Sequence, residues 1–244
     1  MSLKQNNSIS VVIPAHNEEN NISKTLIALL NQNIKPKEVI VVDNHSTDHT
    51  LKIIQSFKEK FFKKKIKLKI LSEPKIGVAL ARNKGFFSAS SSIIASTDAD
   101  TIPHSDWIEK IQNHFQKYDS IAVTGISIMI DSTPFIRLIS QLNYYKYLTL
   151  LLRLIFGFQT ITTANAAIKK SAFKDVKGFD TKYVSTNQLD DTELSSRLYK
   201  IGPIRVDTSI KTDGSFRRYQ PFKRAVSSSL IRLKSFAYIA KNRQ

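Results

Sequence analysis

Short apolar runs alternate with segments of helical periodicity, and this alternation is the feature that most restricts the fold of the chain. Ile9 to Ile13 and Val39 to Val42 are continuous β-branched runs, typical of strands buried on both faces of a parallel sheet. The segment between them has apolar side chains at helical spacing, at Ile22, Leu26, Leu29 and Leu30. This β-α-β-α order predicts an α/β fold in which helices flank a mostly parallel central sheet joined by right-handed crossovers.

The rest of the chain continues this pattern, and its 244 residues suit one large α/β domain. We expect further strands near residues 66–71, 93–95, 121–130, 162–168 and 204–210. Further helices are expected over residues 77–89, 105–117, 170–179 and 188–199, and a loop over residues 213–218.

Polar residues follow each of the early strands at the point where the strand ends. Pro14 to Glu18 come after the first run, and Asp43 to Asp48 come after the second. The triplet Asp98-Ala99-Asp100 follows the apolar run Ile93 to Ala95. Open α/β sheets bind ligands at the carboxyl ends of their strands, so these clusters are expected to meet in one crevice. Two carboxylates one residue apart can share a divalent cation that holds a diphosphate, although such pairs also occur in turns and helix caps.

Two predicted helices carry charged residues near their first turns. Arg82 follows a strand end, where it is either a surface residue or a group that reaches an anionic ligand in the same crevice. Asp190, Asp191 and Glu193 open a later helix. Acidic residues in a first turn suit the helix dipole, but three carboxylates in four positions exceed what capping requires.

The charge balance favours anionic partners, because 37 basic residues against 20 acidic ones give a net charge of +17. Nucleic acid, anionic lipid and phosphorylated ligands all fit this excess. The basic run Lys58 to Lys69 is interpreted as a solvated helix end and loop in preference to a phosphate or membrane contact. Cysteine is absent, which excludes disulfides and thiolate metal sites. The N-terminus lacks the apolar core of a signal peptide, so we expect a cytoplasmic protein.

Two segments leave a membrane contact open. Asn143 to Phe158 is the most apolar stretch and is shorter than the ~20 residues that a membrane crossing needs. It is either a core helix or a helix lying in the bilayer interface. Residues 219–244 predict a basic amphipathic C-terminal helix, which either docks on an anionic membrane or packs back on the domain.

Five motifs, in this order and spacing, resemble the family-2 glycosyltransferases: VVIPAHNEE, VIVVDNHSTDHT, GVALARNKG, STDAD and LDDTELSSRL. The resemblance covers roughly Ser8 to Arg218. It implies the GT-A fold, a Rossmann-like nucleotide-sugar-binding architecture, over residues 1–218. The nucleotide-sugar-binding half would span about 8–125 and the acceptor and catalytic half 126–218, followed by the amphipathic helix.

The resemblance also implies roles for individual residues. Asp43 would accept a hydrogen bond from the base, His16 would place its ring against the base, and Arg82 would close the pocket. Asp100 would be the main ligand of a divalent cation, Mn²⁺ or Mg²⁺, with Asp98 near the ribose and the metal. Asp191 would be the catalytic base, with Asp190 beside it. The implied nucleotide-sugar-binding set is Pro14, Ala15, His16, Asn17, Glu18, Asp43, Asn44, Arg82, Asp98, Ala99, Arg217 and Arg218.

The sequence departs from the family pattern at three places. Asn44 and His45 stand where Asp and Gly are common, and Asp190 stands where Glu is usual. The assignment of the base therefore stays open between Asp191, Asp190 and Glu193. The Gln-x-x-Arg-Trp motif of processive synthases is missing, so we expect transfer of one sugar at a time.

The residue types suit a metal-dependent, inverting glycosyl transfer. A bound cation stabilises the departing nucleoside diphosphate, and a carboxylate opposite it takes the proton of the acceptor hydroxyl. The expected donor is a nucleotide-diphospho-sugar, with a UDP-sugar favoured. The expected acceptor is a glycan, with a lipid-linked or cell-envelope glycan as the hypothesis. The protein itself is expected in the cytoplasm, either free or peripheral at the inner face of the cell membrane.

The sequence suits three other functions less well: nucleic-acid binding, nucleotidyl transfer and ligand binding without catalysis. The basic residues concentrate in the Lys58 to Lys69 run and the tail, outside the predicted crevice, so no nucleic-acid partner is expected. A nucleotidyltransferase would have a glycine-rich, basic loop after its first strand, which is absent here. An inactive GT-A module that only binds ligand is the main alternative.

Overall fold

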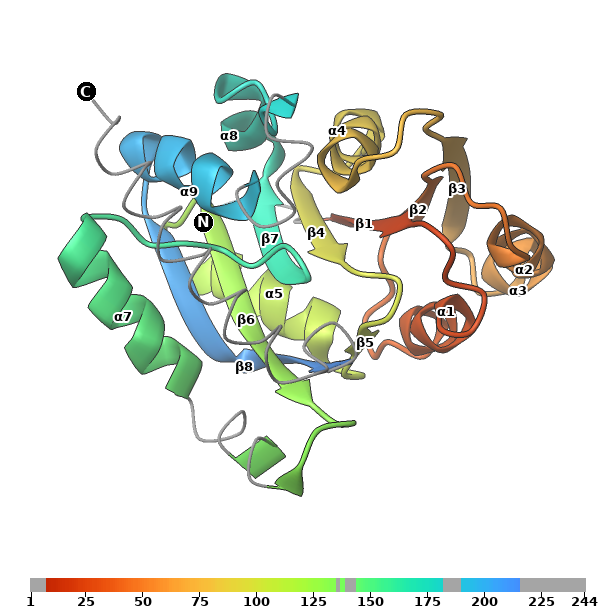
Figure 1. Cartoon of the computed structure of the whole chain (residues 1–244), viewed down its shortest axis with the longest axis horizontal. Coiled ribbons are helices and arrows are strands. Elements are labelled where there is room, and N and C mark those ends of the chain that lie inside the picture. Colours follow the sequence, from red (N-terminus) through yellow and green to blue (C-terminus); the bar gives the residue numbers. More distant parts are fainter. Residues whose placement is uncertain (1–7, 135–136, 139–143, 182–189, 216–244) are drawn as a thin grey trace, which may run out of the picture.

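The computed structural model describes residues 8–134, 137–138, 144–181 and 190–215. Its centre is an eight-stranded sheet in the order β3-β2-β1-β4-β7-β6-β8-β5, with helices on both faces (Figure 1). The strands are β1 (Ile9–Ala15), β2 (Glu38–Asp43), β3 (Lys67–Ser72), β4 (Ile93–Thr97), β5 (Ile102–Pro103), β6 (Ala122–Met129), β7 (Asn165–Lys169) and β8 (Ile204–Gly214). The predicted α/β fold class is confirmed.

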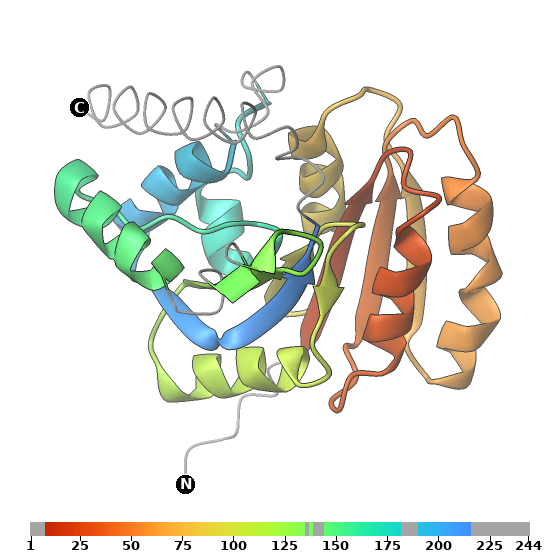
Figure 2. The same ribbon diagram turned by 60° about the horizontal axis from the view of Figure 1, so that its bottom comes forward.

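The helices divide between the two faces of the sheet. One core contains apolar residues of α1 (Ile22–Leu30), α2 (Thr50–Ser56), α3 (Lys58–Lys63) and α5 (Trp107–Lys117). The other contains residues of α4 (Val78–Ser88), α8 (Lys170–Asp175) and α9 (Asp190–Ile201) (Figure 2). Val11 faces the first core and Val12 the second, because successive strand residues point to opposite faces. The continuous apolar runs are thus buried on both sides, as predicted.

Strand direction differs between the two halves of the sheet. The pairs β1–β2, β1–β4 and β2–β3 are parallel, as is β6–β8. The pairs β4–β7, β6–β7 and β5–β8 are antiparallel. Four of these seven pairs are parallel. The antiparallel pairs involve the later strands β5 to β8, where the sequence alternates less regularly between strands and helices.

Strand β8 is longer than predicted and overturns part of the expected loop at residues 213–218. Asp213 and Gly214 belong to the strand because both pair with β6, and Asp213 also pairs with Ile102 of β5. Pairing on both sides outweighs the local turn preference of the Asp-Gly sequence. Arg217, Arg218 and residues 219–244 lie outside the described residues.

A histidine ties α5 to β8 in a geometry that resembles a catalytic triad. His114 contacts Asp207 through Nδ1 at 2.8 Å and Ser120 Oγ through Nε2 at 3.1 Å. The hydrogen bond with His114 lowers the pKa of Asp207 to about 2. Ser120 is 0% exposed, so its hydroxyl cannot meet a substrate. We interpret this cluster as structural.

Helix α7 (Tyr144–Phe156) does not lie in the core. Its described apolar side chains are mainly exposed, and Thr149 is buried. No helix among the described residues is both long enough and apolar enough to cross a bilayer.

A buried carboxylate at the start of β2 anchors three strands and a loop. Glu38 accepts hydrogen bonds from Ser10 Oγ at 2.7 Å and from the Ser90 backbone N–H at 2.6 Å, and pairs with Lys69 at 2.6 Å. Burial by itself raises the pKa of Glu38, but the ion pair and hydrogen bonds outweigh it and lower the pKa to about 2. The stabilisation therefore exists above the ordinary carboxylate pKa and is lost as pH falls towards 2.

We predict that Glu38→Gln lowers the free energy of unfolding at pH 7 by about 2–3 kcal/mol, since a neutral amide cannot replace the ion pair. Denaturant unfolding at pH 7, 5 and 3 should show the difference from wild type shrinking with acidity. Glu59→Gln, which changes an exposed pair with Lys63, is the matched control and should change stability by less than about 0.5 kcal/mol. A pH-independent difference for Glu38→Gln would contradict this explanation.

Candidate active site

The strand ends that were predicted to form a crevice lie where the strand order reverses between β1 and β4. The loop after β1 is bound to the loop after β2: His16 Nδ1 is 2.7 Å from the Asn44 carbonyl oxygen. Asn17 has a positive φ of 53° and accepts a hydrogen bond from the Thr47 N–H at 2.8 Å. The Glu18 N–H donates to Thr50 Oγ1 at 2.7 Å. Two predicted polar clusters therefore form one connected rim, with Pro14 and Ala15 buried at the end of β1.

Asp43, the last residue of β2, and Asn44, which follows it, have different surroundings. Asp43 is buried, and its Oδ1 has no hydrogen-bond partner among the described residues. A buried carboxylate oxygen without a donor is costly, which indicates a place for a ligand donor. The Asn44 amide donates to the carbonyls of Glu73 at 3.1 Å and Lys75 at 2.7 Å, and its Oδ1 accepts from the Gly77 N–H at 2.8 Å. Asn44 thus fixes the loop that leads into α4.

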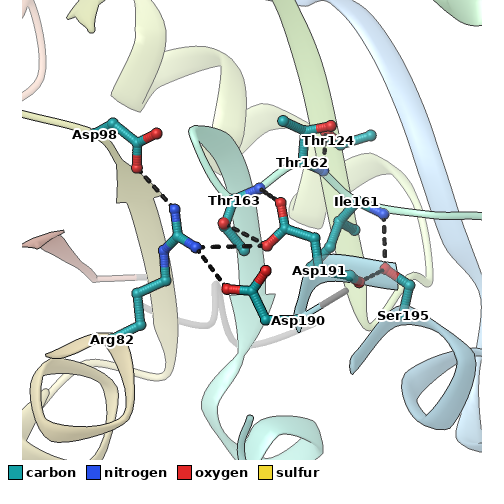
Figure 3. A network of polar contacts seen from close by, with 9 residues as sticks. All are labelled: Arg82, Asp98, Thr124, Ile161, Thr162, Thr163, Asp190, Asp191 and Ser195. Carbon is teal, nitrogen blue, oxygen red and sulfur yellow. Dashed lines mark hydrogen bonds and ion pairs between the residues drawn. The ribbon is translucent and has the colours of Figure 1, made fainter. Parts of the chain in front are cut away.

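Arg82 of α4 lies at the centre of a buried ion cluster (Figure 3). Its Nη2 is 2.8 Å from Asp98 Oδ1, and its Nη1 is 3.2 Å from Asp190 Oδ2 and 3.7 Å from Asp191 Oδ1. Burial by itself lowers the pKa of Arg82, but the charges of Asp98, Asp191 and Asp190 outweigh it and raise the pKa. The cluster joins the end of β4 to the first turn of α9.

The two carboxylates of α9 have different environments. The Asp190 side chain is 7% exposed and faces Arg82, and burial together with the charge of Asp191 raises the pKa of Asp190. The Asp191 side chain is 20% exposed and is held from the other side by Thr163. The Thr163 hydroxyl donates to Asp191 Oδ1 at 2.6 Å, and its N–H donates to Oδ2 at 3.0 Å. Glu193 turns away and pairs with Arg197 at 2.5 Å.

Asp98 and Asp100 share a turn at the end of β4, in which the Thr101 N–H donates to the Asp98 carbonyl. Ala99 is buried, and its carbonyl accepts from Thr25 Oγ1 at 2.8 Å. Within the described ranges, no three His, Asp or Glu side chains are grouped as a protein-only metal site. Mg²⁺ commonly takes one or two carboxylates and completes its shell with phosphate oxygens and water. The donor set of Asp98 and Asp100 fits a cation bound together with a diphosphate.

The sequence model of Glycosyl transferase family 2 matches residues 10–177, which include the rim, Arg82, the Asp98-Asp100 turn and Thr163. The chain belongs to glycosyltransferase family 2.

Relatives of this family-2 chain are known from several bacteria. The probable glycosyltransferase YdaM of Bacillus subtilis is 31% identical over 219 residues, which cover 82% of this chain and 49% of that protein. The poly-beta-1,6-N-acetyl-D-glucosamine synthase of Staphylococcus epidermidis is 28% identical over 200 residues, covering 80% of this chain and 47% of the relative. The chain thus spans about half the length of these curated relatives.

A solved structure supports the fold of the family-2 chain. The TarS 1-349 fragment of S. aureus, in complex with UDP-GlcNAc, superposes with a TM-score of 0.65 at 22% identity. The match covers 82% of this chain and 56% of the fragment. At this identity the likeness shows the GT-A fold and nothing finer.

One residue of the family-2 site was missed from the sequence. A strand was predicted to begin at Thr162, but β7 begins at Asn165. Thr163 gives both its N–H and its hydroxyl to Asp191, so it cannot also pair as an ordinary strand residue. Polar threonines just before a buried apolar run were the available signal, but sequence spacing does not reveal a partner 28 residues away.

We predict that Asn44→Asp destabilises this family-2 domain by about 2–4 kcal/mol, because a carboxylate cannot donate to the Glu73 and Lys75 carbonyls and places a charge against them. Denaturant unfolding at neutral pH measures the change. Asn33→Asp, at an exposed position, is the control and should stay within about 0.5 kcal/mol of wild type. Equal stability of the two variants would show that the Asn44 amide does not hold the loop.

Proposed function

We propose that this chain transfers one sugar from a nucleotide-diphospho-sugar, with a UDP-sugar favoured, to a glycan hydroxyl. The observation that carries the proposal is the Arg82 cluster. The Arg82 guanidinium contacts both Asp98 at the end of β4 and Asp191 at the start of α9. A donor-side carboxylate and an acceptor-side carboxylate at one rim are what glycosyl transfer requires. The resemblance to family-2 relatives supports the same reaction.

In this proposal the donor lies across the carboxyl ends of β1, β2 and β4. Asp43 supplies the acceptor for the N–H of the base, since its buried Oδ1 meets no donor within the part of the chain that the structure describes. Asp98 and Asp100 would hold Mn²⁺ or Mg²⁺, which would supply Lewis-acid stabilisation of the leaving diphosphate. The rim from Pro14 to Glu18 borders the nucleotide. Arg217 and Arg218, which lie outside the described residues, are expected from the sequence alone to bind the phosphate.

Asp191 is the proposed catalytic base. It is more exposed than Asp190, and two hydrogen bonds from Thr163 fix the orientation of its carboxylate. Asp190 is buried against Arg82, which suits it to hold that guanidinium in place. A base that removes the acceptor proton while the acceptor oxygen attacks opposite the leaving diphosphate gives inversion at the anomeric carbon. Thr163 is a positioning residue in this scheme.

A screen of nucleotide sugars with and without Mn²⁺ tests the proposal as a whole. Donor hydrolysis, or thermal stabilisation by one donor in the presence of metal, is the expected result. Stabilisation without any turnover would favour the alternative of an inactive binding module. Absence of both effects across UDP-, GDP- and dTDP-sugars would contradict a nucleotide-sugar site.

We predict that Asp191→Asn lowers kcat for donor hydrolysis or transfer by about 10²- to 10⁴-fold and leaves the Kd of the donor within about threefold. Nucleotide release and calorimetric donor titration give the two values. Glu193→Gln is the matched control, because Glu193 belongs to the same first turn but pairs with Arg197. Full activity of Asp191→Asn, or equal loss in both variants, would refute the assignment.

We predict that Thr163→Val lowers kcat about tenfold, because it removes one hydrogen bond that orients the base. Thr163→Ser keeps the hydroxyl and should restore most of kcat. Donor Kd and thermal midpoint separate the loss of orientation from a loss of folding. If valine and serine reduce kcat equally, the hydroxyl does not position Asp191.

A further inference from the structure

Helix α7 presents an apolar stripe to solvent. Five side chains at spacing i, i+3, i+4, i+7 and i+8 are between 46% and 75% exposed: Tyr147, Leu150, Leu151, Leu154 and Ile155. This spacing places them on one side of the helix. Helical stripes of this kind normally face a core, and contiguous exposed apolar patches mark interaction sites. Figure 1 shows α7 at the rim of the molecule, at the end opposite α2 and α3.

The sequence around α7 is free of negative charge. No Asp or Glu occurs between Asp131 and Asp175, whereas six basic residues do: Arg137, Lys146, Arg153, Lys169, Lys170 and Lys174. The stripe is thus part of a purely basic segment in a chain of net charge +17. Each such residue near an anionic bilayer contributes about 1 kcal/mol of attraction.

We propose that the α7 stripe docks on the surface of an anionic lipid bilayer. The helix has 13 residues, or about 20 Å of length at 1.5 Å per residue, so it would lie in the interface and not span it. Charge favours a bilayer over two other possible occupants of the stripe, a second copy of the chain and its own tail. A second copy would bring another chain of net charge +17 to the stripe, and the tail 219–244 carries six basic residues and no acidic one. Both contacts would be repulsive, whereas a phosphate-rich surface is attractive.

Docking at α7 would also orient the proposed site. The chain leaves α7 at Gly157 and reaches Thr163 six residues later. That connection is bound to α9, because the Ile161 N–H donates to Ser195 Oγ at 3.0 Å and Thr163 donates to Asp191. The proposed acceptor-side carboxylate, Asp191, is therefore held by the segment that directly follows α7. Only this step rests on the proposed function, and it names a membrane-borne glycan acceptor as the substrate class.

The absence of cysteine permits a direct test with the full chain. Leu154→Cys and Phe62→Cys each receive an environment-sensitive fluorophore, and the probes are phosphatidylcholine vesicles with or without phosphatidylglycerol. Phe62 is 82% exposed on α3, within the other basic run, and is the matched control. We expect a blue shift and quenching by lipid-chain quenchers for the label at residue 154 only, with phosphatidylglycerol present and at low salt.

A pair of charge variants completes the test. Leu151→Glu with Leu154→Glu should weaken vesicle binding about tenfold or more, while Phe62→Glu should leave it within about twofold. Donor hydrolysis should be unchanged in both, which separates this inference from the proposed function. No shift at residue 154, an equal shift at residue 62, or a concentration-dependent dimer lost in the α7 variant would each overturn the proposal.

Discussion

The guanidinium of Arg82 is the contact on which the arrangement of the crevice depends. Asp98 belongs to the end of β4 and Asp190 and Asp191 to the start of α9, and Arg82 is within 3.7 Å of all three carboxylates. Buried charges are tolerated only when paired, so this cation fixes the position of α9 relative to the parallel half of the sheet. Three ionised carboxylates around one guanidinium leave an excess of two negative charges, so the three side chains would repel one another without Arg82.

Much of the fold could be predicted because the first half repeats one pattern. Continuous β-branched runs require burial on both faces, and the helices between them leave only a parallel arrangement. Strand direction in the second half could not be predicted, because a buried apolar run such as Asn165–Lys169 suits a parallel or an antiparallel neighbour equally well. Tertiary packing decides its partners and their direction. The end of β8 was missed for the same reason: its pairing with β6 and β5 outweighs a local turn signal.

The candidate site was predictable in its location but not in its internal contacts. Strand-end motifs identify Asp43 and Asp98 because the topology brings strand ends together, and the acidic first turn of a predicted helix identifies Asp191. Which oxygen meets which donor depends on rotamers and on loops far apart in sequence. Asn44 thus proved to hold a neighbouring loop with its whole amide, and Thr163 proved to bind a carboxylate although it had been predicted as a strand residue. Residue type shows what a side chain can bind, while the partner follows from the fold.

The difference between Asp190 and Asp191 follows from this geometry. Adjacent residues on a helix point about 100° apart, so Asp190 approaches Arg82 to 3.2 Å while Asp191 stays 3.7 Å away and is more exposed. Asp190 takes the buried direction, where burial together with the charge of Asp191 raises its pKa. Asp191 takes the more exposed direction, where Thr163 fixes its carboxylate through two donors. A proton acceptor needs access to the incoming hydroxyl and a fixed lone pair, and Asp191 alone combines them. The shorter side chain at position 190 therefore leaves the proposed base in place, because Asp190 pairs with Arg82 and Asp191 is held separately by Thr163.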